Sequence, residues 1–183
     1  MKNCNMSEVQ DKNISNELFN AISKVCLLAL DVDGVLTDGS IYYTSNNECF
    51  RRFNVYDGQG LQFLMKAGIE VAIFSAKLCP SISNRMQDLG IKNIYIGSED
   101  KFRDLNTLCQ TLSLELSQVA YIGDDINDLP IMHKVGCPLT VSNAMVENLV
   151  LALYVTEQSG GNGAVREICD LMLHIRRPFR LIS

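Results

Sequence analysis

The stretch VCLLALDVDGVLTDG, residues 25–39, decides the fold of this chain. It opens with an unbroken apolar run over residues 25–30, which is typical of a strand buried on both faces of a parallel sheet. Asp31 and Asp33 follow at the end of this run, and Gly34 comes directly after them. Because ligands of open α/β sheets bind beyond the carboxyl ends of the strands, this pattern predicts that both carboxylates face a binding crevice.

Two carboxylates at this spacing, with backbone N–H groups between them, suit a divalent cation and a phosphate group. A hard cation takes oxygen ligands, and successive amides at a turn form a concave site for an anion. The alternative is an ordinary surface turn, because Asp and Gly are also common in turns after strands. The rest of the chain favours the binding site.

Length and composition predict one globular domain with a substantial core, since the chain has 183 residues of which 47% are hydrophobic. The net charge of −5 argues against a nucleic-acid partner. The seven cysteines are scattered without a CxxC pair, which suits a reducing compartment. No run is long enough to span a bilayer and the N-terminus has no apolar signal core, so we expect a soluble cytoplasmic protein without a membrane partner.

Predicted strands alternate with predicted helices along the chain. Strands are expected at 25–31, 70–74, 93–96, 118–122, 138–141 and 153–155. Helices are expected at 7–23, 60–66, 80–88, 100–113, 127–134 and 164–174, and residues 1–6 are expected to be disordered. This alternation predicts a parallel sheet with right-handed crossovers.

A β-hairpin is expected directly after the aspartate pair. Two aromatic, β-prone runs at 39–44 and 49–53 flank an Asn-rich turn at 45–48. Because this hairpin follows the predicted site in the sequence, residues 40–53 are expected to form a flap over it.

Further polar side chains follow the predicted strands: Ser75, Lys101 at a helix start, and Asp124, Asp125 and Asp128. In this order they resemble the motifs of the haloacid dehalogenase superfamily of phosphohydrolases, from about residue 25 to 173. The closer likeness is to the capless branch of that superfamily, which includes the 3-deoxy-D-manno-octulosonate 8-phosphate phosphatases. The stretches that carry it are DVDGVLTDG at 31–39, FNVYDGQG at 53–60, VAYIGDDINDLPIM at 119–132 and GGNGAVREICDLML at 160–173.

The resemblance implies a single three-layer, Rossmann-like α/β domain over residues 1–183, with helices on both faces of a parallel sheet and no cap domain. It also implies Mg²⁺-dependent hydrolysis of a phosphate monoester through an aspartyl-phosphate. Asp31 is then the nucleophile and Asp33 the general acid and base. The magnesium ligands are then Asp31, the Asp33 backbone carbonyl and Asp124.

Other roles follow from the same resemblance. The Ser75 hydroxyl is expected to hold phosphate oxygens, and Lys101 is expected to offset their charge. Asp125 is expected to orient Lys101 or a water near the metal. Asp128 is either a comparable supporting group or an early-helix acid favoured by the helix dipole.

Substrate binding is assigned by the resemblance to Asp33, Asn54, Val55, Tyr56, Asp57, Gly58, Lys77, Arg85 and Lys101. Tyr56, Gln62 and Lys77 stand where the family tends to have arginine, and lysine does not match the two-pronged grip of arginine on a carboxylate. The expected substrate is a phosphorylated acid sugar, first 3-deoxy-D-manno-octulosonate 8-phosphate. A nonulosonate 9-phosphate or another small sugar phosphate is the alternative.

The spacing from Asp33 to Ser75 and from Ser75 to Lys101 leaves no room for a cap domain. The resemblance implies that a neighbouring subunit of a homotetramer covers the site instead, with residues 156–183 reaching over it. The glycine-rich loop 159–163 and Arg166 are the candidates for this contact, against an ordinary lead-in to a helix. The alternative functions from other classes are a non-catalytic regulatory or assembly module and a phosphotransferase.

Overall fold

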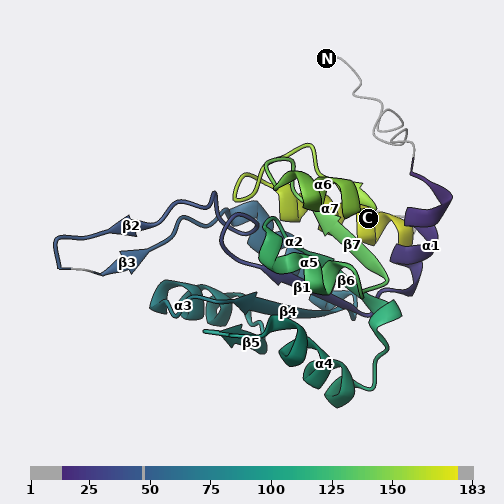
Figure 1. The fold of residues 1–183 in the computed structure, drawn as a ribbon, viewed down its shortest axis with the longest axis horizontal. Coiled ribbons are helices and arrows are strands. Elements are labelled where there is room, and N and C mark those ends of the chain that lie inside the picture. The colour runs from purple at the N-terminus through teal and green to yellow at the C-terminus, as the bar shows by residue number, and fades with distance from the viewer. Residues whose placement is uncertain (1–13, 47, 177–183) are drawn as a thin grey trace, which may run out of the picture.

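The computed structural model describes residues 14–46 and 48–176, and Figure 1 shows how these residues fold. Their main feature is a six-stranded sheet in the order β5-β4-β1-β6-β7-β8, in which every neighbouring pair is parallel. The strands are β1 Leu27–Asp31, β4 Glu70–Ser75, β5 Asn93–Ile96, β6 Val119–Ile122, β7 Cys137–Thr140 and β8 Tyr154–Val155.

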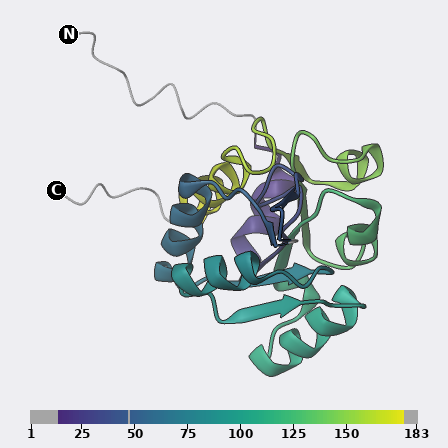
Figure 2. The ribbon, with the colours of Figure 1, turned by 90° about the vertical axis from the view of Figure 1, so that its left-hand side faces the viewer.

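Helices cover both faces of this sheet, which gives the molecule three layers (Figure 2). One face packs against α1 Asn16–Lys24, α2 Val55–Lys66, α3 Pro80–Leu89 and α7 Ala164–Arg176. The other packs against α4 Lys101–Leu112 and α5 Leu129–Met132, and α6 Val146–Leu151 lies beside α5. The predicted three-layer α/β fold is therefore confirmed.

Strand β1 shows why its sequence is apolar throughout. Leu28 and Leu30 belong to the core on the α2 and α7 side, whereas Leu27 and Ala29 belong to the core on the α4 side. All four are fully buried, because β1 lies in the middle of the sheet with a helical layer on each face.

The predicted hairpin is also confirmed, although its paired strands are only two residues long each: β2 Tyr42–Tyr43 and β3 Cys49–Phe50. The Tyr42 and Phe50 rings stack with their centroids 5.3 Å apart. Figure 1 shows the hairpin projecting from the layered body. Strands β2 and β3 extend away from the six-stranded sheet, and the base of the hairpin lies nearest to it.

Several predicted helix boundaries were wrong. Helix α2 begins at Val55 instead of residue 60, because the Asn54 side chain accepts the Tyr56 N–H and caps the helix earlier. The predicted helix 127–134 is a 3₁₀ turn, Ile126–Asp128, followed by the single turn of α5. Helix α6 was not predicted at all, since six residues are too few for a clear period.

At the start of the described chain, α1 begins at Asn16 with Ser15 as its cap. The rest of the predicted helix 7–23, and the disorder expected for residues 1–6, lie outside the described residues. Between β1 and β4 the structure holds only the hairpin and α2, so the described residues form no cap domain. No helix within 14–46 or 48–176 is long and apolar enough to cross a membrane.

Candidate active site

The polar side chains predicted from the strand ends meet at one edge of the sheet. β4, β1 and β6 are neighbours and parallel, so their carboxyl ends lie together. Asp31 is the last residue of β1 and Ser75 the last of β4, while Asp124 follows β6 after one glycine. Lys101 is the first residue of α4, which begins near the same edge.

Lys101 stands between two buried carboxylates. Its Nζ lies 3.1 Å from Asp31 Oδ1 and 2.8 Å from Asp128 Oδ1. Asp128 is fully buried and also accepts hydrogen bonds from the Tyr121 hydroxyl at 2.8 Å and the Asp124 N–H at 3.1 Å. Through these contacts Asp128 holds both Lys101 and the loop after β6.

Asp31, Asp124 and Asp128 form an acidic cluster in which each offers a carboxylate oxygen within 4.8 Å of the others. Asp124 Oδ1 is buried and has no hydrogen-bond partner among the described residues. A buried oxygen without a partner is costly, and a hard divalent cation takes such oxygen ligands. The cluster therefore fits Mg²⁺.

The acidic cluster holds more negative than positive charge, and the pKa values of Asp31, Asp124 and Lys101 reflect this excess. Burial, followed by the charge of Asp128, raises the pKa of Asp31 to about 7. Burial, followed by the charges of Asp31 and Asp128, raises the pKa of Asp124 to about 8. Burial acts to lower the pKa of Lys101, but the neighbouring Asp31 and Asp128 outweigh it and raise that pKa. Lys101 thus stays positively charged, but its single charge does not balance three carboxylates. A bound metal cation would offset the remaining negative charge.

Gly34 makes the approach of Asp124 possible. Its φ of +91° lies in a region that side chains rarely adopt, and a Cβ there would come within 1.9 Å of Asp124 Oδ2. The turn that follows is held by Thr37, whose Oγ1 accepts the Gly34 N–H at 3.3 Å. The glycine directly after the aspartate pair is therefore needed by the site itself.

Asp33 is paired with an arginine that we did not predict. Arg51 follows β3, is almost completely buried, and donates from Nε and Nη2 to the two Asp33 oxygens at 2.7 and 3.0 Å. The hydrogen bond to Asp33 raises the pKa of Arg51, so the guanidinium stays charged. The only signal in the sequence is a basic pair, Arg51-Arg52, in an otherwise apolar hairpin arm.

Ser75 is buried at the end of β4, and its Oγ accepts the Lys77 N–H at 3.2 Å. The Lys77 side chain is exposed in the loop before α3. Asp125 is exposed as well, and its carboxylate accepts the Ile126 N–H at 2.8 Å, which caps the 3₁₀ turn. Ser75 therefore lies at the carboxyl end of β4, at the edge of the site. Asp125 follows Asp124 in the chain and faces solvent.

The predicted substrate-binding segment forms the first turn of α2. Val55 and Tyr56 are 74% and 69% exposed. The Arg85 guanidinium donates to the Asn54 carbonyl at 3.5 Å and lies against Gly58, where a Cβ would meet it at 2.5 Å. Arg85 therefore lies against the first turn of α2, and its assignment to substrate binding stays a prediction.

Asp57, which the resemblance assigns to substrate binding, is buried against the start of α7. It is 1% exposed, and its carboxylate accepts the Gly163 N–H at 3.3 Å and the Arg166 N–H at 2.8 Å. Burial raises the pKa of Asp57, and these amides act against that rise. The Asp57 carboxylate therefore accepts the free N–H groups at the start of α7, and it joins α2 to the glycine-rich loop.

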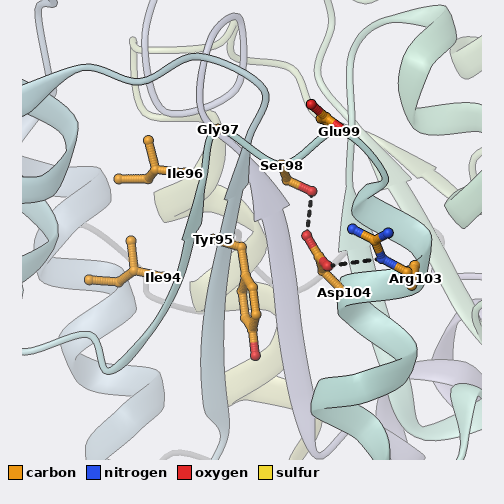
Figure 3. Close-up of a pocket in the computed structure, with 8 residues that line it drawn as sticks. All are labelled: Ile94, Tyr95, Ile96, Gly97, Ser98, Glu99, Arg103 and Asp104. Carbon is orange, nitrogen blue, oxygen red and sulfur yellow. Dashed lines mark hydrogen bonds and ion pairs between the residues drawn. The ribbon is translucent and has the colours of Figure 1, made fainter.

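Two other features lie near the site. Arg52 joins the hairpin to the glycine-rich loop, since it donates to Asp38 at 3.0 Å and to Asn162 at 2.8 Å. A hollow of about 370 Å³ lies between the end of β5 and the start of α4 (Figure 3). Ser98 donates to Asp104 within it, but none of its lining residues belongs to the acidic cluster.

The fold and the site together define the class of haloacid dehalogenase-like hydrolases, and the family model for that class matches residues 93–168. The 3-deoxy-D-manno-octulosonate 8-phosphate phosphatase of Salmonella typhi is 41% identical over 160 residues, which cover 87% of this chain and 85% of that protein. With a relative this similar, the chain belongs to the family of 3-deoxy-D-manno-octulosonate 8-phosphate phosphatases within this superfamily.

Solved structures of the family agree with this assignment. The enzyme of Yersinia pestis is 40% identical with a TM-score of 0.86, and the match covers 88% of this chain and 87% of that one. The enzyme of Moraxella catarrhalis, solved with a magnesium ion, a phosphate ion and KDO, is also 40% identical with a TM-score of 0.86. That match covers 88% of this chain and 92% of the other.

Proposed function

We propose that this enzyme is a Mg²⁺-dependent phosphomonoesterase that hydrolyses 3-deoxy-D-manno-octulosonate 8-phosphate to KDO and phosphate. The observation that carries the proposal is the buried cluster in which Lys101 lies within hydrogen-bonding distance of both Asp31 and Asp128. The relative solved with magnesium, phosphate and KDO supports the same chemistry. A nonulosonate 9-phosphate is the second candidate, because Tyr56 and Lys77 replace arginines expected at recognition positions.

In the first half of the reaction, an Asp31 oxygen forms a bond to phosphorus while the bond from phosphorus to the sugar oxygen breaks. Lys101, 3.1 Å from Asp31 Oδ1, orients this carboxylate and offsets the charge of the phosphate. Magnesium held by Asp31, Asp124 and the Asp33 carbonyl supplies further positive charge against the phosphate. The Ser75 hydroxyl and the amides after Asp31 hold the remaining phosphate oxygens.

Asp33 supplies the proton that the leaving sugar oxygen needs, and it later takes a proton from the water that hydrolyses the aspartyl-phosphate. The bidentate pair with Arg51 fixes the position of Asp33 before substrate binds. To act as the general acid, Asp33 has to leave at least part of this pair and carry a proton when it meets the leaving oxygen. The hairpin base therefore takes part in controlling the general acid.

The proposal includes a homotetramer in which neighbouring subunits cover the site. Large apolar side chains are exposed on the hairpin and the adjoining turn of α2. A monomeric protein rarely exposes several such side chains next to one another. They include Tyr43 at 69%, Phe50 at 47%, Val55 at 74% and Tyr56 at 69% exposure. Residues 156–176 begin the C-terminal segment expected to contact a neighbour, and the rest of it lies outside the described residues.

A cytoplasmic location is also part of the proposal. The six cysteines of the described residues are all free, as is usual in a reducing compartment. Cell fractionation of the native protein tests the location, and sedimentation of the purified protein tests the tetramer.

The function is tested by phosphate release, with and without Mg²⁺, from a panel of sugar phosphates that includes both named candidates. We expect turnover that requires Mg²⁺ and prefers the octulosonate ester. Preference for the nonulosonate ester selects the second candidate, and no metal-dependent hydrolysis of any ester supports a non-catalytic module. Transfer of phosphate to a second alcohol instead of water identifies a phosphotransferase.

The nucleophile is tested by Asp31→Asn, which retains the shape of the side chain but removes the attacking charge. We expect a loss of roughly 10³-fold or more in kcat, because no other side chain replaces a covalent nucleophile. Asp38→Asn is the matched control, since Asp38 lies in the same loop but makes an exposed pair with Arg52. An active Asp31→Asn variant contradicts the assignment.

A further inference from the structure

Two thiols meet at the base of the hairpin, next to the general acid. Cys49 lies in β3, and Cys79 directly precedes α3 after the loop from β4. Their Sγ atoms are 3.2 Å apart, and Cys79 Sγ is 3.5 Å from the Cys49 carbonyl oxygen. A disulfide bond measures about 2.05 Å, so a further approach of about 1.2 Å brings the two sulfurs to bonding distance.

The surroundings of this pair suit thiol chemistry. Cys49 is partly exposed, whereas Cys79 is only 3% exposed, so an oxidant from solvent meets Cys49 first. Burial acts to raise the pKa of Cys79, but hydrogen bonds with Ser81 and Cys49 and the charge of Arg51 outweigh it and lower this pKa to about 7. Cys79 is therefore prepared to attack an oxidised Cys49 as a thiolate.

The two thiols are also connected to Asp33 through the Arg51 side chain. Arg51 Nη1 donates to Cys49 Sγ at 3.4 Å, while the same guanidinium holds both oxygens of Asp33. A change at Cys49 therefore reaches Asp33 through a single side chain.

We propose that Cys49 and Cys79 form a reversible regulatory disulfide in response to a hydroperoxide. The Cys49 sulfur attacks hydrogen peroxide, becomes a sulfenic acid and releases one water. The Cys79 thiolate then attacks that sulfur, the S–O bond breaks, and with one proton the oxygen leaves as a second water. The two thiols lose two electrons, and the peroxide gains them.

The disulfide ties β3 to the start of α3 and so fixes the base of the hairpin. It also occupies the Cys49 sulfur to which Arg51 donates, which leaves Asp33 as the principal partner of the guanidinium. The general acid is then held in its pair, and turnover falls. This effect on turnover rests on the proposed phosphatase function, whereas formation of the disulfide does not.

The disulfide itself is tested on the full-length protein with graded hydrogen peroxide, followed by peptide mapping under non-reducing conditions. We expect a linked pair of peptides that contain Cys49 and Cys79, which disappears after dithiothreitol. Cys26→Ala is the matched control, since Cys26 is also partly exposed and its Sγ contacts the Lys24 carbonyl and the Gln118 amide instead of a thiol. This variant should still form the link, whereas Cys49→Ala and Cys79→Ala should not.

The effect on activity is measured on the same samples. Oxidation should lower kcat roughly tenfold in the wild type and in Cys26→Ala, and dithiothreitol should restore it. Cys49→Ala should resist the loss, with Cys49→Ser as a second variant if the first folds poorly.

Two results overturn the proposal. One is oxidation of other cysteines without any link between Cys49 and Cys79. The other is an equal loss of activity in the wild type and in both Cys49 variants. If the protein hydrolyses none of the esters but the link still forms, then the proposed function has failed and the redox site stands.

Discussion

At the scale of single residues, Gly34 sets the distance between the two halves of the site. It allows Asp124, which follows β6, to approach the turn that follows β1, and the space that a Cβ would fill is taken by Asp124 Oδ2. The substitution Gly34→Ala therefore adds both backbone strain at positive φ and a collision with a predicted magnesium ligand.

We expect Gly34→Ala to lose nearly all Mg²⁺-dependent activity and to be less stable than the wild type by more than the ~1 kcal/mol of the left-handed strain alone. Gly68→Ala is the matched control, because Gly68 has a φ of +82° and open space around its Cβ position. Urea unfolding and a Mg²⁺ titration of activity measure both effects. Equal behaviour of the two variants contradicts the role of the close contact with Asp124.

Single residues also show which parts of the site can be predicted from the sequence. Asp31, Ser75, Lys101 and Asp124 were singled out because each lies at a strand or helix end, and the structure brings these ends together. Arg51 was missed, because its pairing with Asp33 depends on how the hairpin folds back. Contacts between the ends of neighbouring strands can be predicted from the sequence, because they follow from the topology of the sheet. A contact that depends on the conformation of one loop cannot be predicted in this way.

At the scale of elements, the start of α2 serves the packing of the C-terminal helix. The Asp57 carboxylate caps α7 through the amides of Gly163 and Arg166, and α2 packs along α7. The family resemblance assigned Asp57 to substrate binding because it lies in the FNVYDGQG stretch. The structure offers the cap as a physical reason for an aspartate at this position.

The two interpretations of Asp57 predict different measurements. If the cap is its role, Asp57→Ala should destabilise the protein by about 1–2 kcal/mol and leave KM nearly unchanged. Asp88→Ala, at an exposed position of α3, should change neither quantity. Thermal unfolding and steady-state kinetics separate the cases, and a raised KM at unchanged stability returns Asp57 to substrate binding.

Element boundaries were the least predictable part of the fold. The helix was expected only from residue 60, yet α2 begins at Val55 and holds Gly58 and Gly60, which allow close packing against Arg85 and Cys169. The low helix propensity of glycine was outweighed by tertiary contacts that only the folded chain provides. The strands of the sheet, whose apolar runs are set by burial alone, were predicted to within two residues at each end.

At the scale of the whole molecule, the acidic cluster links cation binding to folding. The pKa of Asp31 is raised to about 7 and that of Asp124 to about 8, mainly by burial. In the unfolded chain such carboxyls ionise near about pH 4, so between about pH 4 and 8 the folded state binds more protons. The free energy of unfolding of the metal-free protein therefore falls as pH rises through this window.

Magnesium should reverse this loss, because it binds the charged carboxylates and offsets their repulsion. At a concentration about 100 times its Kd, it should add about 2.7 kcal/mol at pH 8, which raises Tm by about 5–10 °C. At pH 5 protons compete for the same oxygens, so the gain in Tm should be much smaller. Scanning calorimetry at both pH values, with sodium chloride of equal ionic strength as control, measures it. Asp124→Asn should abolish most of the gain at pH 8, whereas a gain that is the same at both pH values, or retained by this variant, places the cation elsewhere.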